Sequence, residues 1–325
     1  MKTANPSFSV VRIAVPTPFP VGPVNVYLIE SDPPILVDVG PNTPEAYEAL
    51  DRGLREHGYS FSDLGFILLT HGHIDHMGLL ARILDESRAP AYAHPHAVAR
   101  AAGFDSDGQT SHDFFTALMW EFGVPEEQIA LSVSDQGHYH RYGARVEIQH
   151  VLRDGDHVAH LTACFVPGHS PSDTLFVDSE AKCAFVGDHI LRLTNPVPLI
   201  RRPPPGQTRA KSLIEFTTSL QRTRQLNLRL CHPGHGSSIE NPNQVIDKIL
   251  NRNEERTRRV REILGDAELT PYDVCRALFP KMDIRYLNLG LASAIGHLEV
   301  LEEAKLVSSR HHCGVLYYSV ISASE

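Results

Sequence analysis

The chain alternates between short apolar runs and longer amphipathic stretches, a pattern typical of proteins that mix strands and helices. The apolar runs, many of them bounded by Pro or Gly, predict strands at 8–15, 24–29, 35–39, 64–70, 91–93, 161–166, 174–177, 183–186 and 228–231. The amphipathic stretches predict helices at 44–57, 76–86, 111–122, 209–225 and 242–264. Because both kinds of element recur along the chain, we predict an α/β fold.

Two segments depart from this alternation. Residues 94–150 hold helical patterns and few strand signals, and we interpret them as a helical insertion. Near the end of the sequence, helical patterns at 271–278 and 287–303 precede a predicted hairpin at 306–321, an order that resembles a small winged-helix module. The predicted domains are residues 1–264, which include the insertion, and residues 265–325.

Composition narrows the classes of partner. With 42% hydrophobic and 21% charged residues among 325, the chain is ordinary globular material, and its net charge of −9 disfavours nucleic acid as a partner. The longest uncharged run, 13–29, contains four prolines, so we expect no membrane span. The first twenty residues lack a signal-peptide pattern and the five cysteines form no CxxC, so we expect a cytoplasmic protein. The oligomeric state stays open, with a homodimer as one alternative.

The 19 histidines include one dense cluster, His71-Gly-His73-Ile-Asp75-His76, which follows a predicted buried strand and opens a predicted helix. Alternate residues of an extended segment point to the same side, so His71 and His73 can share one metal ion. Asp75 and His76, beyond the turn, can address a second ion. The alternative interpretation is a polar helix start, with Asp75 as its cap and the imidazoles in solvent.

Three more glycine-flanked polar residues follow predicted strands. His169 lies in Pro-Gly-His-Ser, Asp188 in Gly-Asp-His and His235 in Pro-Gly-His-Gly. Each of these alone is more often a simple turn. Together, at successive strand ends, they predict a metal site at the edge of a β-sandwich. His232, which lies three residues before His235, is interpreted as a neighbour of the site.

These motifs resemble the HxHxDH…H…D…H signature of the metallo-β-lactamase fold hydrolases, and the resemblance covers about residues 8–250. It implies a four-layer αββα sandwich with a dinuclear metal site at one edge. The chain departs from the pattern at Gly72, where Thr is frequent. The resemblance implies that one metal is held by His71, His73 and His169, that the other is held by Asp75, His76 and His235, and that Asp188 bridges them.

Two divalent ions can share a water molecule and lower its pKa towards neutrality, so the implied chemistry is hydrolysis, with Asp75 and Asp188 as the catalytic carboxylates. Nitrogen and oxygen ligands suit zinc, which we predict, and also iron or manganese. A β-lactamase of the best-known subgroup would offer Cys in place of Asp188, so antibiotic hydrolysis is disfavoured.

The predicted substrate is a small molecule with an acyl group, held as a thioester, ester or lactone. One alternative is a single-strand RNA endonuclease, and another is a metal-binding or interaction protein without turnover. The basic pair Arg201 and Arg202 could hold a phosphate, although a solvated Pro-rich loop explains it equally well. Tyr139 and Tyr142 could supply a hydroxyl to the substrate.

Overall fold

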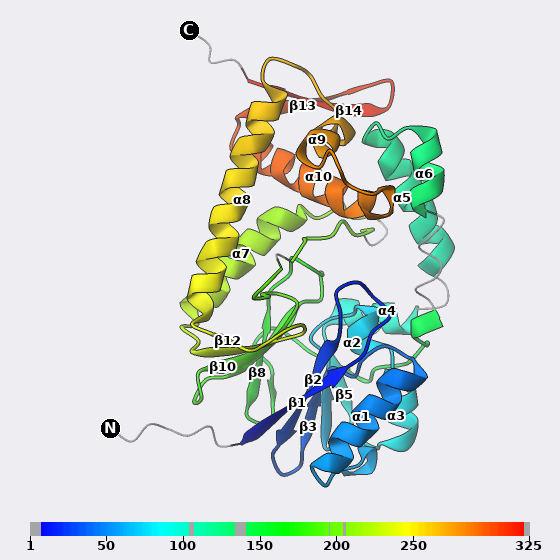
Figure 1. Ribbon diagram of the computed structural model, residues 1–325, viewed down its shortest axis with the longest axis vertical. Coiled ribbons are helices and arrows are strands. Elements are labelled where there is room, and N and C mark those ends of the chain that lie inside the picture. Colours follow the sequence, from blue (N-terminus) through cyan, green and yellow to red (C-terminus); the bar gives the residue numbers. More distant parts are fainter. Residues whose placement is uncertain (1–7, 104–106, 134–140, 195, 204–205, 322–325) are drawn as a thin grey trace. The chain divides into compact units, whose positions relative to one another are not determined.

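The computed structural model describes residues 8–103, 107–133, 141–194, 196–203 and 206–321 (Figure 1). The chain divides into two compact units. The first comprises residues 1–107, 139–196 and 219–246, and the second comprises residues 108–138, 197–218 and 247–325. Within the described ranges, no helix is both long and apolar enough to span a membrane.

The first unit contains two six-stranded sheets. The first sheet has, in spatial order, β1 (Ser9–Val15), β2 (Val24–Glu30), β3 (Ile35–Val37), β4 (Phe66–Leu68), β5 (Ala91–Ala93) and β6 (His150–Val151). The second has β12 (Ile239–Glu240), β11 (Leu230–Pro233), β10 (Cys183–Gly187), β9 (Thr174–Asp178), β8 (Leu161–Phe165) and β7 (His157–Val158). The pairs from β3 to β6 and the pair β10–β11 are parallel, and the remaining pairs are antiparallel.

Alternation along β2 explains how the sheets pack. Val26 and Leu28 point into an apolar core shared with Leu50 of the helix α1 (Pro44–Glu56). Tyr27 and Ile29 of β2 point into a second core, shared with Phe176 of the other sheet. A strand whose two faces are both apolar is buried between two layers. The predicted α/β sandwich is therefore confirmed.

The other helices of the first unit lie after strands of the first sheet (Figure 1). They are η1 (Phe61–Asp63), α2 (Ile74–Met77), α3 (Leu80–Glu86) and α4 (Pro95–Ala102). The sequence predicted one helix over 76–86, but the helix is interrupted at Gly78 and Leu79. At Gly78 the backbone carbonyl of Tyr142 comes so close that a Cβ atom would lie 2.3 Å from its oxygen.

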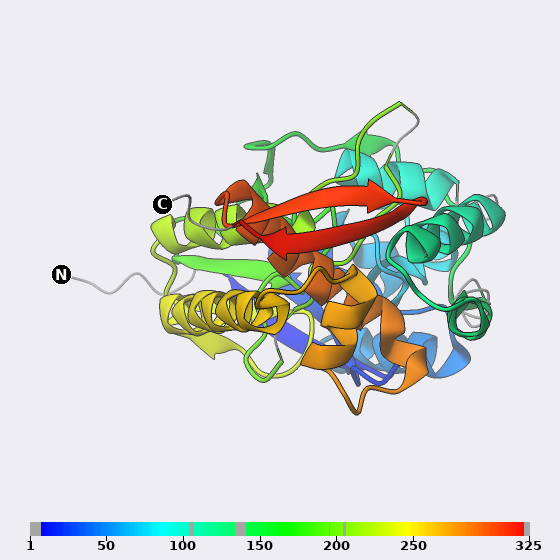
Figure 2. The ribbon, with the colours of Figure 1, turned by 90° about the horizontal axis from the view of Figure 1, so that it is seen from above.

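The second unit is mainly helical, and its hairpin appears in red in Figure 2. It contains α5 (Asp107–Glu121), α6 (Glu126–Val133), α9 (Pro271–Leu278), η3 (Ile284–Tyr286), α10 (Leu287–Glu303), β13 (Val307–His312) and β14 (Val315–Val320). The helices α7 (Ser212–Gln225) and α8 (Pro242–Leu264) each run from one unit into the other.

One apolar core explains where the second unit begins. Met119 of α5 and Val260 of α8 pack in the same cluster as Leu298 of α10. The predicted boundary after residue 264 therefore differs from the observed division, because α8 and α5 share their core with the C-terminal helices. The order helix, helix, hairpin over 271–320 agrees with the prediction, and the winged-helix interpretation of this segment stays a prediction.

Candidate metal centre

The structure brings all seven predicted ligands together within the first unit. They fall into three overlapping groups in which the nitrogen or carboxylate atoms all lie within 4.8 Å of one another. The groups are His71, His73 and His169; His71, His76 and Asp188; and Asp75, His76 and His235. They lie in the segments that follow β4, β8, β10 and β11, with Asp75 and His76 on α2, so the strand ends bring together side chains that are distant in sequence.

In the first group three ring nitrogens converge. Nε2 of His71 lies 2.9 Å from Nδ1 of His73, and Nε2 of His169 lies 3.0 Å from the same atom. The hydroxyl of Thr70 donates its single hydrogen to Asp38, so it accepts from Nδ1 of His71 at 3.1 Å. Burial holds the pKa of His71 well below its ordinary value. His71 is therefore neutral, with the lone pair of Nε2 directed at the group.

The group of Asp75, His76 and His235 is also held by hydrogen bonds to the ring nitrogens that face away from it. Nδ1 of His76 donates to Asp38 at 2.7 Å, and Nδ1 of His235 donates to the backbone carbonyl of Pro23 at 2.8 Å. The opposite nitrogen of His235 then lies 3.3 Å from a carboxylate oxygen of Asp75. Carbonyl or carboxylate partners of this kind orient metal-binding imidazoles in proteins.

Asp188 lies between the group of His71, His73 and His169 and the group of Asp75, His76 and His235. Its Oδ1 is 3.6 Å from Nε2 of His76, and its Oδ2 is 3.7 Å from Nε2 of His169 and 3.6 Å from Nε2 of His235. Burial acts to raise the pKa of Asp188, but the surrounding imidazoles, led by His76, hold it well below its ordinary value. The ionised carboxylate can therefore serve both groups at neutral pH.

Buried atoms without hydrogen-bond partners show that these residues fit a cation. Among the described residues, Nε2 of His76, Nε2 of His235 and Oδ1 of Asp188 are buried and accept or donate no hydrogen bond. Such atoms are rare in native proteins unless an ion or water satisfies them. Burial alone would lower the pKa of His76, yet the carboxylates of Asp38, Asp75 and Asp188 raise it well above its ordinary value. A divalent cation would replace that proton.

Sequence reasoning missed Asp38 and Thr70. Asp38 is 1% exposed and has φ of 60°, and it accepts hydrogen bonds from the backbone and hydroxyl of Thr70, each at 2.8 Å. Asp38 therefore orients His76 directly, and it orients His71 through the hydroxyl of Thr70. The sequence signal that could have indicated Asp38 is an acidic residue at the end of an apolar strand, followed two residues later by Gly40.

A serine that sequence reasoning also missed joins two ligand loops. The backbone N–H of Gly72 donates to Oγ of Ser172 at 3.0 Å, and Ser172 pairs with Oγ of Ser170 at 2.8 Å. This links the loop of His71 and His73 to the loop of His169. At position 72 space for a side chain is tight, because a Cβ there would lie 3.3 Å from the Cα of Ala97 in α4.

His232 and Tyr142 make contacts of other kinds. His232 is buried and stacks on Phe185 with ring centroids 4.9 Å apart, and it belongs to none of the three groups. Tyr142 packs edge-on against Phe19 at 5.3 Å, and its hydroxyl accepts from Arg141. Tyr139 lies outside the described residues, and Arg201 and Arg202 belong to the second unit. A substrate role for these four residues, Tyr139, Tyr142, Arg201 and Arg202, stays a prediction.

Comparison with known proteins identifies the family. Residues 19–257 match the metallo-beta-lactamase superfamily, and the chain belongs to that superfamily. It is 31% identical over 317 residues to the probable metallo-hydrolase YqjP of Bacillus subtilis, covering 96% of this chain and 98% of that protein.

Two further proteins are similar to this chain. The atrochrysone carboxyl ACP thioesterase of Aspergillus fumigatus is 29% identical over 136 residues, which cover 38% of this chain and 39% of that protein. The crystal structure of the metallo-beta-lactamase family protein TTHA1429 from Thermus thermophilus superposes with a TM-score of 0.78 at 26% identity, covering 96% and 98% of the two chains. The chain is therefore a member of a metallo-hydrolase family along almost its whole length.

Proposed function

We propose that this protein is a dinuclear metal-dependent hydrolase that cleaves a carboxylic thioester, ester or lactone. One observation carries the proposal: the carboxylate of Asp188 lies among two groups of ligand-type side chains, and its Oδ1 and the Nε2 atoms of His76 and His235 are buried without a hydrogen-bond partner among the described residues. A pair of divalent ions, which we propose to be zinc, lowers the pKa of water and polarises a substrate carbonyl when bound.

The protein's own residues hold the ligands in one orientation. Asp38, Thr70 and the carbonyl of Pro23 each accept a hydrogen bond from an imidazole, so the opposite nitrogen of each ring is the one directed at the site of a cation. Asp188 faces both groups and sets their separation. Asp75 contributes the second negative charge, and together the two carboxylates offset the charge of the cations.

Several observations favour an acyl substrate. The relative from Aspergillus fumigatus bears the name of a thioesterase, and Asp188 occupies the position where β-lactamases of the best-known subgroup would offer Cys. Two exposed apolar side chains lie on loops that carry ligand contacts. Val21, 46% exposed, lies two residues before Pro23, and Leu193, 87% exposed, lies five residues after Asp188. Exposed apolar side chains on these segments suit an acyl chain better than an RNA backbone.

The test combines metal analysis with a substrate panel. Purified protein should hold two divalent ions per chain, and it should hydrolyse members of a panel of acyl thioesters, esters and lactones, with single-stranded RNA and a β-lactam as comparisons. Asp188→Asn should reduce the rate more than about 100-fold, since even residues outside the ligand set cost 10–100-fold. Asp51→Asn, on the surface of α1, is the matched control and should keep full activity.

Each of the other outcomes contradicts the proposal. Cleavage of RNA alone would favour the endonuclease alternative, and metal binding without turnover of any substrate would favour a non-catalytic protein. Full activity in Asp188→Asn would exclude the shared carboxylate from the mechanism.

A further inference from the structure

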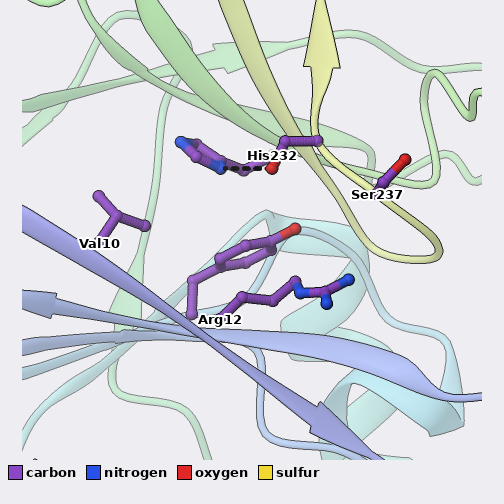
Figure 3. A pocket seen from close by; sticks show the side chains of 6 residues that line it. Val10, Arg12, His232 and Ser237 are labelled. Carbon is purple, nitrogen blue, oxygen red and sulfur yellow. Dashed lines mark hydrogen bonds between the residues drawn. The ribbon is translucent and has the colours of Figure 1, made fainter.

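A hollow lies within the same unit as the metal centre. It has a volume of about 310 Å³ and lies between β1 and the loop that follows β11. Figure 3 shows Arg12 extending along one side of the pocket, with His232 and Ser237 on the other side. The lining residues are Val10, Arg12, Tyr27, His232, Ser237 and Ser238.

Two arginines converge on this loop from different parts of the chain. One nitrogen of Arg12 donates to the backbone carbonyl of Gly236 at 3.0 Å. Arg192, which does not line the pocket itself, donates to Oγ of Ser237 at 3.4 Å. The guanidinium groups are therefore anchored to adjacent residues, and each keeps further N–H donors that these contacts do not use.

Neither arginine has an acidic partner in the part of the chain that the structure describes. Other arginines of the same unit do: Arg55 pairs with Asp51, Arg82 with Glu86 and Arg222 with Asp154. The protein as a whole carries a net charge of −9, so carboxylates are plentiful. The two guanidinium groups bind the adjacent residues Gly236 and Ser237, and neither pairs with a carboxylate of the described residues. They form a local positive site in an acidic protein.

The buried side chains around them add no charge. Burial lowers the pKa of His232 to about 4, so its ring is neutral near pH 7. Nδ1 of His232 lies 3.4 Å from Oγ of Ser238, and the hydroxyl of Tyr27 donates to the carbonyl of Pro233 at 2.8 Å. The positive charge at the pocket therefore comes from the arginines, and the hydroxyls of the two serines supply neutral hydrogen bonds.

The site is close to the metal centre along the chain. Ser237 follows the ligand His235 by two residues, which places their Cα atoms within about 7 Å. Arg192 follows Asp188 by four residues, which places their Cα atoms within about 14 Å. A group held at this pocket is therefore within the length of a small substrate from the centre.

We propose that Arg12, Arg192 and Ser237 form a subsite for one oxyanion group of the substrate, a phosphate or a carboxylate, beside the scissile acyl bond. This assignment rests on the proposed hydrolase function, because it places the anion on the substrate of that reaction. Guanidinium groups bind both kinds of oxyanion by charge-assisted hydrogen bonds. The subsite would select acyl compounds whose leaving group or acyl chain carries negative charge.

A binding experiment tests the subsite without turnover. The metal-loaded protein is titrated with methyl phosphate or acetate while the arginine Nε–H signals are followed by NMR. The signals of Arg12 and Arg192 should shift and saturate, and whichever anion saturates at lower concentration identifies the group. Arg55, already paired with Asp51, is the internal control. Shifts at Arg12 and Arg192 no larger than that of Arg55, or shifts that never saturate, would overturn the proposal.

Kinetics then connects the subsite to the reaction. Acyl-pantetheine and acyl-pantetheine 4′-phosphate carry the same thioester, and only the second carries a phosphate. The ratio of their kcat/KM values should favour the phosphate, and Arg192→Gln should lower that ratio about tenfold, the loss of one contact worth about 1.4 kcal/mol. Arg192→Lys should restore part of the ratio, and Arg55→Gln should leave it unchanged.

The two proposals fail in different ways. If neither thioester is hydrolysed while Arg12 and Arg192 still bind the anion, the acyl hydrolase function is wrong and the anion site stands. If both thioesters are hydrolysed equally well and neither arginine responds to the anions, the subsite is wrong and the hydrolase function stands. If methyl phosphate and acetate bind only at the metal centre, the signals of both arginines stay unmoved, which also overturns the subsite.

Discussion

Asp38 accepts a hydrogen bond from Nδ1 of His76 at 2.7 Å, and both side chains are almost completely buried. The same carboxylate accepts from the backbone N–H and the hydroxyl of Thr70. Three donors therefore converge on one side chain that belongs to none of the three ligand groups. The residue that follows β3 by one position therefore orients two ligands, His76 directly and His71 through Thr70.

Asp38→Asn should lower metal affinity about 10–100-fold. An amide accepts at one oxygen only, so its NH₂ group would face Thr70 or His76 where the carboxylate accepts hydrogen bonds. Asn tolerates the positive φ of this position, so the backbone should keep its conformation. Competition with a chromogenic chelator measures the affinity, with Asp51→Asn as control. Unchanged affinity would show that Asp38 does not orient His76.

Ser172→Ala should weaken the first ligand group selectively. The variant leaves the buried N–H of Gly72 without its acceptor, which costs about 1–3 kcal/mol and loosens the loop of His71 and His73. A calorimetric metal titration should show one weakened step and one unchanged step. Ser62→Ala, on the surface, is the control. Two equally weakened steps would point to a general loss of folding instead.

Removal of the metal should lower the melting temperature. Ligands that bind only the folded protein stabilise it, by about 2.7 kcal/mol at a free concentration one hundred times Kd. In the metal-free protein, the negative charges of Asp75 and Asp188 lose the cation that balances them. Calorimetry after treatment with a chelator, followed by zinc addition, measures the shift and its reversal. A melting temperature that does not change on chelation would contradict the ligand assignment.

His297 should make the second unit sensitive to acid. It is 2% exposed, and burial lowers its pKa to about 3, while Nδ1 lies 2.8 Å from the hydroxyl of Thr257. Between pH 6.5 and 3 the unfolded chain binds the proton more readily than the folded chain does, so stability falls as the pH falls. The loss is about 1.4 kcal/mol per pH unit, or about 2 kcal/mol from pH 6.5 to 5.

His297→Asn isolates this contribution, because Asn can keep the hydrogen bond to Thr257 and does not titrate. The free energy of unfolding of the variant should depend less steeply on pH than that of the original protein, as measured by urea unfolding at pH 6.5 and 5. Parallel pH profiles would show that His297 is not buried as a neutral ring.

Local patterns in the sequence were sufficient for the long elements and the ligands. The strand 91–93 and the helices 271–278 and 287–303 have the predicted bounds, because apolar periodicity and caps are encoded locally. The seven ligands were predicted because each lies beside glycine or within one short motif at a strand end. There the same few residues show both a turn and a side chain that can bind a metal.

Other features depend on contacts between distant residues. The strands β6, β7 and β12 have two residues each, too few to show alternation. The contact of Asp38 with His76 spans 38 positions and that of Ser172 with Gly72 spans 100, so no local pattern reports them. The close approach of the Tyr142 carbonyl to Gly78, where the predicted helix is interrupted, likewise joins residues far apart in the sequence.

The acceptor for His235 differs in kind from those for His71 and His76, because it is the main-chain carbonyl of Pro23 rather than a side chain. A single substitution can delete Asp38 or Thr70, but every amino acid at position 23 would carry a carbonyl. Random mutagenesis that selects for loss of metal should therefore recover positions 38 and 70 and rarely recover position 23. One ligand of the centre is thus held by a contact that point mutation can displace but cannot remove.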